Sequence, residues 1–168
     1  IVAPGAEVRL LGLYLAAGLQ HIDNHTTVRH RVGPATSIEE YRGILNGRAR
    51  CVFNGKAQVY AGADGTDASQ SNHNLLLSDR AEIDTKPELE IYADDVKCSH
   101  GATVGQLDEN ALFYLRSRGL DESTARQLLT RAFAAGTLSL LPIEACRGYL
   151  DAALDERLRS LLGESNES

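Results

Sequence analysis

Two side chains that bind soft metals lie close together in the second half of the chain. Cys98 and His100 are separated by one residue, where the pattern changes from strand-like to helical. In an extended strand, residues i and i+2 point to the same side, so this thiol and imidazole would lie side by side. Both groups are soft or borderline metal ligands. The pair predicts part of a metal site, whose other ligands come from elsewhere, and the alternative is a buried thiol beside a hydrogen-bonded histidine.

The other histidines offer weaker candidates. His21 and His25 have the i, i+4 spacing of a helical metal site, but their segment has the period-2 pattern of a strand. His25 and His30 are expected on opposite strand faces, and surface or ladder histidines are favoured over metal ligands. His73 is expected to point away from the two asparagines that flank it.

Classes of catalytic chemistry find little support. The chain has no Gly-x-Ser-x-Gly elbow and no phosphate-binding loop. Cys51 and Cys146 lie on apolar faces and are predicted to be core thiols. The adjacent acids Glu39-Glu40 and Asp94-Asp95 diverge on a strand, which favours solvated turn acids over an acid/base pair.

Composition limits the classes of partner and the cellular compartment that the chain fits. The net charge of -6 and the absence of a Lys/Arg run argue against nucleic acid. No apolar run reaches the roughly 18 residues of a membrane span, and no signal peptide is apparent. Three scattered cysteines do not form a disulfide framework, which fits a reducing, cytoplasmic setting. The chain starts at Ile1 and contains no methionine, so we expect it to be part of a longer protein.

Short strand-like runs fill the first hundred residues and alternate with turn signals. Turns are predicted at Asn46-Gly47 and Asn54-Gly55. The spacing predicts a mainly β sandwich, barrel or solenoid. Polar residues at inward positions favour a parallel β-helix with stacked polar ladders, as at Gln70, Asn72 and Asn74.

Three amphipathic helices are predicted after the strands. Asp108 would cap the first helix, which ends at Gly119, and Asp121 opens the second, which ends at Gly136. The third is expected from about Pro142 to Leu162. Helices of this length need packing partners, so they should pack on the end of the solenoid or on another protein.

Several motifs carry a family resemblance that spans nearly the whole chain. They are Ala93–Gly105, Leu112–Gly119, Tyr41–Gly43, Asn72–Ser78 and Pro87–Ile91. These stretches resemble the SufB/SufD family of the SUF iron–sulfur cluster assembly machinery. SufB-like members carry a cysteine at about Ala81, so this chain resembles the SufD-like members.

The resemblance implies a fold and a division of the chain. The family has a right-handed parallel β-helix followed by a small α-helical C-terminal domain. Residues 1–106 would form the last coils of the β-helix, residues 107–163 a helical domain that docks an ATPase, and residues 164–168 a disordered tail.

The resemblance also implies partners and a site. Such a chain is a non-catalytic scaffold that pairs with a SufB-like paralogue and docks a SufC-like ATPase. His100 and Cys98 would contribute to a transient Fe–S cluster at the subunit interface, and none would be stably bound in isolation. An isolated chain would form a homodimer through an unpaired edge. The residues expected to contact the ATPase are Leu112, Phe113, Leu128, Leu129 and Phe133.

From the residues alone, a second function stays open. A β-helix enzyme acting on polysaccharide would need carboxylates clustered on one solenoid face, with aromatic side chains that stack on sugars. Aromatic residues make up only 5% of the chain and Trp is absent, which counts against this alternative.

Overall fold

The computed structural model describes residues 1–163, apart from the side chain at position 145, and this part contains seven strands followed by three helices. The predicted tail at 164–168 lies outside the described residues. The bounds are β1 Glu7–Ala16, β2 His21–His30, β3 Thr36–Leu45, β4 Arg50–Val59, β5 Thr66–Leu76, β6 Glu82–Ile91, β7 Val96–Gly105, α1 Glu109–Ser117, α2 Glu122–Leu138 and α3 Glu144–Gly163.

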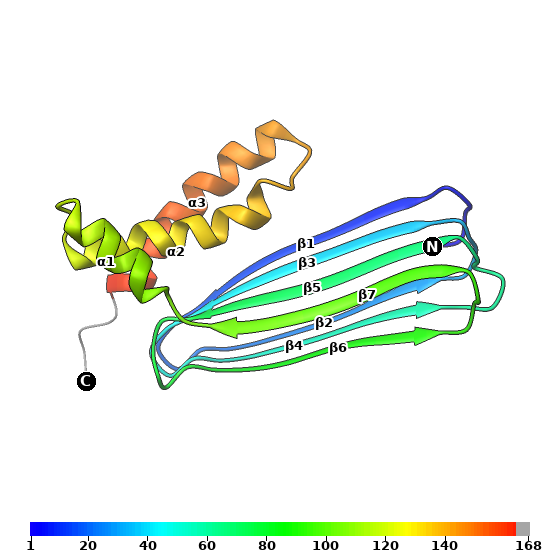
Figure 1. Cartoon of the computed structure of the whole chain (residues 1–168), viewed down its shortest axis with the longest axis horizontal. Helices are drawn as coiled ribbons and strands as arrows, with labels where there is room; N and C mark the ends of the chain where they lie inside the picture. Colours follow the sequence, from blue (N-terminus) through cyan, green and yellow to red (C-terminus); the bar gives the residue numbers. More distant parts are fainter. Residues whose placement is uncertain (164–168) are drawn as a thin grey trace.

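Successive strands alternate between two parallel sheets that face each other. One sheet has the order β1-β3-β5-β7 and the other β2-β4-β6. The strands of one sheet run opposite to those of the other (Figure 1). Glu7 pairs with Thr36, which pairs with Asp67, so each turn of the chain stacks on the preceding one after 29 and then 31 residues. The predicted mainly β solenoid is confirmed.

The strands are longer than the sequence pattern suggested. In β4, Cys51, Phe53, Ala57 and Val59 are buried and alternate with more exposed neighbours, which is the period of a strand with one face in a core. The predicted turn at Asn54-Gly55 is wrong, because both residues lie inside β4. A Cβ atom at Gly55 would collide with the Gln70 side chain across the interior, so this glycine provides space between the sheets.

The inner face of β5 carries the predicted polar ladder. Gln70, Asn72 and Asn74 are exposed by only 4%, 0% and 3%. Asn72 Nδ2 donates to the Tyr14 hydroxyl at 3.2 Å, and Asn72 Oδ1 accepts from Asn74 Nδ2 at 2.6 Å and from Thr85 Oγ1 at 2.8 Å. Burial raises the pKa of Tyr14 to about 12, so its hydroxyl keeps its proton and donates to Asn74 Oδ1. These bonds compensate for burying polar groups.

The helix starts follow the predicted caps. Asp108 Oδ1 accepts from the Asn110 amide at 2.8 Å, and Asp121 Oδ1 accepts from the Thr124 amide at 2.9 Å. Gly119 follows α1 with a φ of 95°, a conformation that glycine adopts without strain. Gly136 does not end α2, which continues to Leu138.

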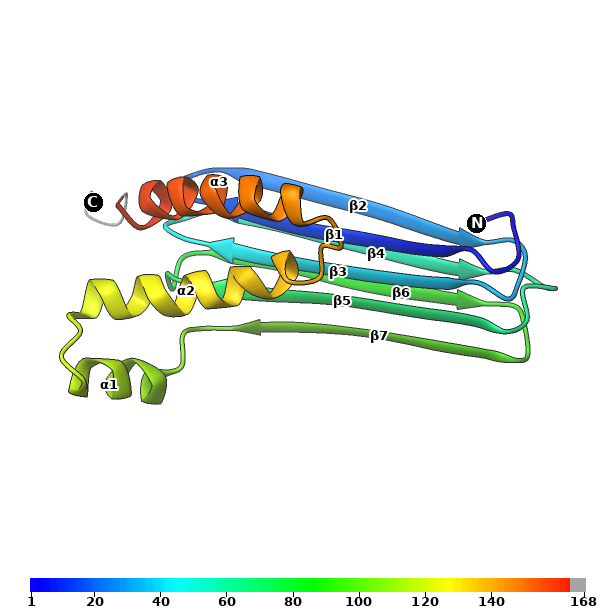
Figure 2. The same cartoon turned by 90° about the horizontal axis from the view of Figure 1, so that it is seen from above.

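Helices α2 and α3 pack on the outer face of the β1-β3-β5-β7 sheet (Figure 2). The packing forms a second core, separate from the interior of the solenoid. Hydrogen bonds join the layers, from Arg42 Nη1 to the Phe133 carbonyl and from Asn46 Nδ2 to the Leu161 carbonyl, each at 2.8 Å, and from Arg126 Nη2 to the Leu77 carbonyl at 3.4 Å. The buried members of this core are Ala17, Ile44, Leu75, Ala134, Leu138, Leu154, Leu158 and Leu161.

Candidate functional site

Strand β7 lies at the edge of its sheet. It pairs with β5 on one side, and no described strand pairs with its other side (Figure 1). Most of its residues are exposed, including Val104, of which 50% is accessible. An edge of this kind presents unpaired backbone N–H and C=O groups along its length.

Cys98 and His100 both lie on β7 and point to the same side of it. Cys98 is in register with Ala68 and His100 with Gln70, two residues on the buried inner face of β5. The thiol and the imidazole therefore lie on the inner face of the sheet, where the solenoid stops. Cys98 is half-buried and His100 is exposed. The expected side-by-side arrangement on a strand is present.

The chemical state of Cys98 follows from its surroundings. Burial, followed by the nearby Asp67 carboxylate, raises the pKa of the Cys98 thiol, although a backbone hydrogen bond at Ala68 opposes the shift. The thiol is thus protonated at neutral pH and must lose its proton to bind a metal. Within residues 1–163, no group of three or more His, Cys, Asp or Glu side chains is placed to hold a metal ion. The pair offers two donors on an open edge.

The remaining histidines are not brought together with this pair. His30 is fully buried and its Nε2 lies 2.8 Å from Ser37 Oγ. His21 and His25 are exposed, and His25 lies 2.9 Å from Asp23. His73 Nδ1 contacts Thr103 Oγ1 at 2.8 Å on the outer face of the sheet. This distribution agrees with ladder and surface roles.

The predictions for Cys146 and for the adjacent acids Glu39-Glu40 are wrong. Cys51 is a buried core thiol, whose pKa burial raises to about 11, but Cys146 is exposed. Glu39 is not a solvated turn acid, because it lies inside β3 with only 3% of its surface exposed. Its neighbour Glu40 is half-buried and forms an ion pair with Arg42 at 3.0 Å. No local sequence signal marked Glu39, because its burial depends on the pairing of β3 with the polar ladder of β5.

The outer face of β4 and β6 holds the carboxylates that a polysaccharide-active solenoid would need. Three of them, Glu82, Glu88 and Glu90, are engaged in ion pairs. Glu82 pairs with Arg50, and Lys56 pairs with Glu88 at 3.2 Å and with Glu90 at 2.8 Å. Lysine contacts lower the pKa of both Glu88 and Glu90, so neither is prepared to act as a general acid.

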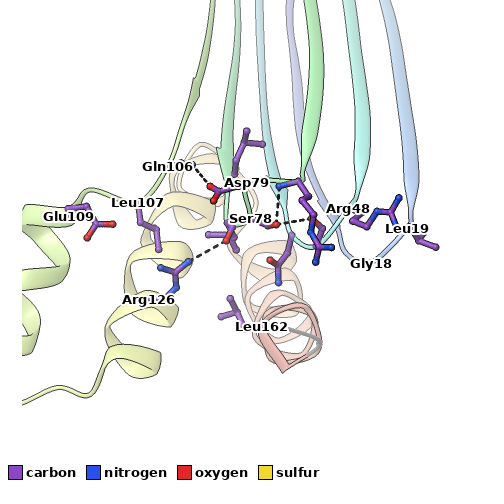
Figure 3. A pocket seen from close by; sticks show the side chains of 15 residues that line it. Gly18, Leu19, Arg48, Ser78, Asp79, Gln106, Leu107, Glu109, Arg126 and Leu162 are labelled. Atoms are coloured by element: carbon purple, nitrogen blue, oxygen red, sulfur yellow. Dashed lines mark hydrogen bonds between the residues drawn. The ribbon is translucent and has the colours of Figure 1, made fainter. Parts of the chain in front are cut away.

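A cleft of about 770 Å³ opens where the end of the solenoid meets the helices. Figure 3 shows that Arg48 and Arg126 line it, together with the carboxylates of Asp79 and Glu109. Gln106 Nε2 donates to Asp79 Oδ1 at 3.2 Å across this end of the solenoid. Neither of the β7 donors lines the cleft, so it is separate from the candidate site.

The helical residues expected to bind a partner divide into two groups. Leu112 is buried, and Phe133 packs against the core beneath α2 and α3, with the Arg42 guanidinium 5.3 Å from its ring centre. Phe113 and Leu128 are 74% and 48% exposed, and Leu129 is partly buried. Phe113 and Leu128 are thus left uncovered by the described part of the chain.

Comparison with known proteins assigns this chain to a family. The profile of the SUF system FeS cluster assembly SufBD core domain matches residues 1–133. The chain belongs to the SufBD family. The resemblance found in its motifs is thereby confirmed.

Named relatives support the same assignment. The chain is 42% identical over 153 residues to iron-sulfur cluster assembly protein SufD of Escherichia coli, covering 91% of this chain and 36% of the relative. It is 44% identical over 144 residues to a SufBD family protein of Synechocystis, covering 86% of this chain and 32% of that protein. The chain spans about a third of the length of these curated relatives. Among the described helices, none is both long and apolar enough to cross a membrane.

Proposed function

We propose that this chain is a SufD-like, non-catalytic scaffold of a cytoplasmic Fe–S assembly complex. It would pair with a SufB-like paralogue, dock a SufC-like ATPase and contribute ligands to a nascent cluster, which is cargo passed on to acceptors. One observation carries the proposal: a chain of the SufBD family places Cys98 and His100 next to each other on an edge strand that has a neighbour on one side only.

The β7 edge supports the pairing step. An exposed strand edge recruits another strand through backbone hydrogen bonds. A paralogue added at β7 would lie directly against the strand that carries Cys98 and His100, and would supply the remaining ligands. A cluster shared between two chains can be released when they separate. In isolation, the same edge would pair with a second copy of this chain.

The exposed faces of the helices support the docking step. Phe113 and Leu128 present large apolar side chains to solvent, whereas Leu112 and Phe133 are used in holding the helices in place. We assign ATPase contact to this exposed group, with Leu129 at its margin. The α2 and α3 packing on the solenoid would then transmit ATPase movement to the sheets.

The test of the assembly role is anaerobic reconstitution. This chain is co-expressed with a SufB-like paralogue and a SufC-like ATPase, and the purified complex is loaded with iron and sulfide. His100→Ala should form the three-subunit complex on size exclusion but lose most of the cluster absorbance, because a ligand is removed without disturbing a core. The matched control is His73→Ala, on the neighbouring strand but on the outer face, which should load normally.

Two outcomes would contradict the proposal. Full loading of the His100→Ala complex would remove that residue from the site. A chain that binds neither partner would contradict the scaffold role itself.

Docking is tested separately through the helices. Leu128→Asp places a charge in the apolar contact and should weaken ATPase binding by about 2 kcal/mol, or roughly 30-fold in Kd. Calorimetry with the purified ATPase measures the loss. Gln127→Asp adds the same charge at the adjacent exposed position and should have little effect. Equal affinities for the two variants would place the ATPase elsewhere.

A further inference from the structure

The inner face of the β1-β3-β5-β7 sheet carries a row of polar side chains that ends at His100. Glu39 of β3 is in register with Gln70 of β5, which is in register with His100 of β7. Glu39 and Gln70 are exposed by only 3% and 4%, whereas His100 is exposed. The row therefore leads from the closed interior of the solenoid to its open end.

The first contact of this row is defined. Gln70 Nε2 donates to Glu39 Oε2 at 2.6 Å, a hydrogen bond to a carboxylate and hence a strong one. Gly55 on the facing sheet leaves the space that the Gln70 amide occupies, since a Cβ atom there would collide with it. The Gln70 carboxamide is thus held from two sides.

The oxygen of the Gln70 carboxamide has no such contact. Gln70 Oε1 is buried and has no hydrogen-bond partner among the described residues. A buried acceptor without a donor costs free energy, so a donor within reach is expected to use it. The oxygen and nitrogen of a carboxamide diverge, so with Nε2 directed to β3 the oxygen faces away from that strand, and β7 is the neighbour on the other side.

We propose that Gln70 is a positioning residue for His100. Its Oε1 accepts the N–H of the His100 imidazole, and Glu39 fixes the orientation of the Gln70 amide from behind. The bond selects one tautomer of the imidazole and leaves the other ring nitrogen unprotonated and directed to the open edge. Metal-binding histidines commonly donate their second nitrogen in this way. The consequence for a cluster rests on the proposed function, but the hydrogen bond does not.

The test reads the tautomer directly. Long-range ¹H–¹⁵N NMR of the imidazoles, recorded on the whole chain at about pH 8 where free imidazole is neutral, distinguishes the two tautomers. Wild type should show one dominant His100 tautomer. Gln70→Leu should change the tautomer ratio by about fivefold, which corresponds to one neutral hydrogen bond. His73, whose Nδ1 contacts Thr103, is the internal control and should not change.

A second variant distinguishes an effect that acts through Gln70 from a general change in the fold. Glu39→Gln keeps the size of the side chain but replaces one carboxyl oxygen by an NH₂ group, so the Gln70 amide is free to reverse. The His100 ratio should move in the same direction as in Gln70→Leu, although residue 39 does not touch the imidazole. Dispersed backbone amide signals confirm that each variant is folded.

An unchanged His100 tautomer in a folded Gln70→Leu or Glu39→Gln variant would overturn the inference. That result would leave the scaffold role intact, because cluster loss in His100→Ala is measured independently. A tautomer that depends on Gln70, together with full cluster loading by His100→Ala, would uphold the hydrogen bond and remove His100 from the proposed cluster site.

Discussion

Strands β5 and β7 are neighbours in one sheet, share a register and have opposite surroundings. The inner face of β5 is closed over by the facing sheet, and its residues Ala68, Gln70, Asn72 and Asn74 are at most 5% exposed. The corresponding residues of β7 are half-buried or exposed. Both strands have the same backbone geometry. Their difference in exposure therefore comes from their place in the sheet: β5 lies between β3 and β7, whereas β7 has only β5 beside it.

The comparison shows how one repeating fold separates stability from recognition. Asn72 and Asn74 on β5 have hydrogen-bond partners inside the chain, so they specify the register and contribute to folding. Cys98 and His100, at positions of β7 in register with the inner face of β5, take no part in this hydrogen-bonded ladder. Substitution of Cys98 or His100 should therefore cost the chain little of its own stability.

The largest expected effect comes from exchanging a ladder residue. Asn72→Leu should lower the free energy of unfolding by about 3 kcal/mol, because the Asn74 amide and the Tyr14 and Thr85 hydroxyls each lose a buried partner. Ala102→Leu, at the paired position of β7, should change it by less than about 0.5 kcal/mol. Urea denaturation with comparison of midpoints and slopes measures both. Similar losses in the two variants would contradict the division of roles.

A smaller effect should appear as a pH dependence of the buried side. Burial holds the pKa of His30 below its usual value of 6.5. As pH falls through 6.5, the unfolded chain takes up a proton that the folded state resists, so stability is present above this value and is lost below it. The urea midpoint should fall between pH 7.5 and pH 5.5, and His30→Gln should flatten that change. Equal slopes in wild type and His30→Gln would show that His30 is not responsible.

Much of the fold was accessible from the sequence because its signals are local. Asp108 and Asp121 mark helix starts by capping, and the alternation of Asn72 and Asn74 marks an inward ladder. Gly55 and Gly136 were misread as turn and helix end, because their role depends on Gln70 and Arg42, which lie far away in the sequence. A glycine that provides space for a distant side chain has the same sequence signature as one that turns the chain.

In the candidate site too, the sequence predicted local features but not those that depend on residues far away in the chain. The strand period was enough to place Cys98 and His100 on one face. It did not identify Glu39, whose burial depends on the pairing of β3 with β5 and on the sheet opposite. Nor did it show that Cys146 is exposed, because the apolar stripe of α3 is covered only where it meets the solenoid, at Leu154, Leu158 and Leu161.

The variable length of the turns has an evolutionary consequence. Paired strands lie 29 residues apart at Glu7 and Thr36 but 32 apart at Arg50 and Glu82, while most strands remain ten residues long. A residue inserted within a strand would move every following side chain to the other face. Insertions and deletions should therefore accumulate between the coils, and lineages can diverge in length there while the terminal strand keeps its alignment with the ladder behind it.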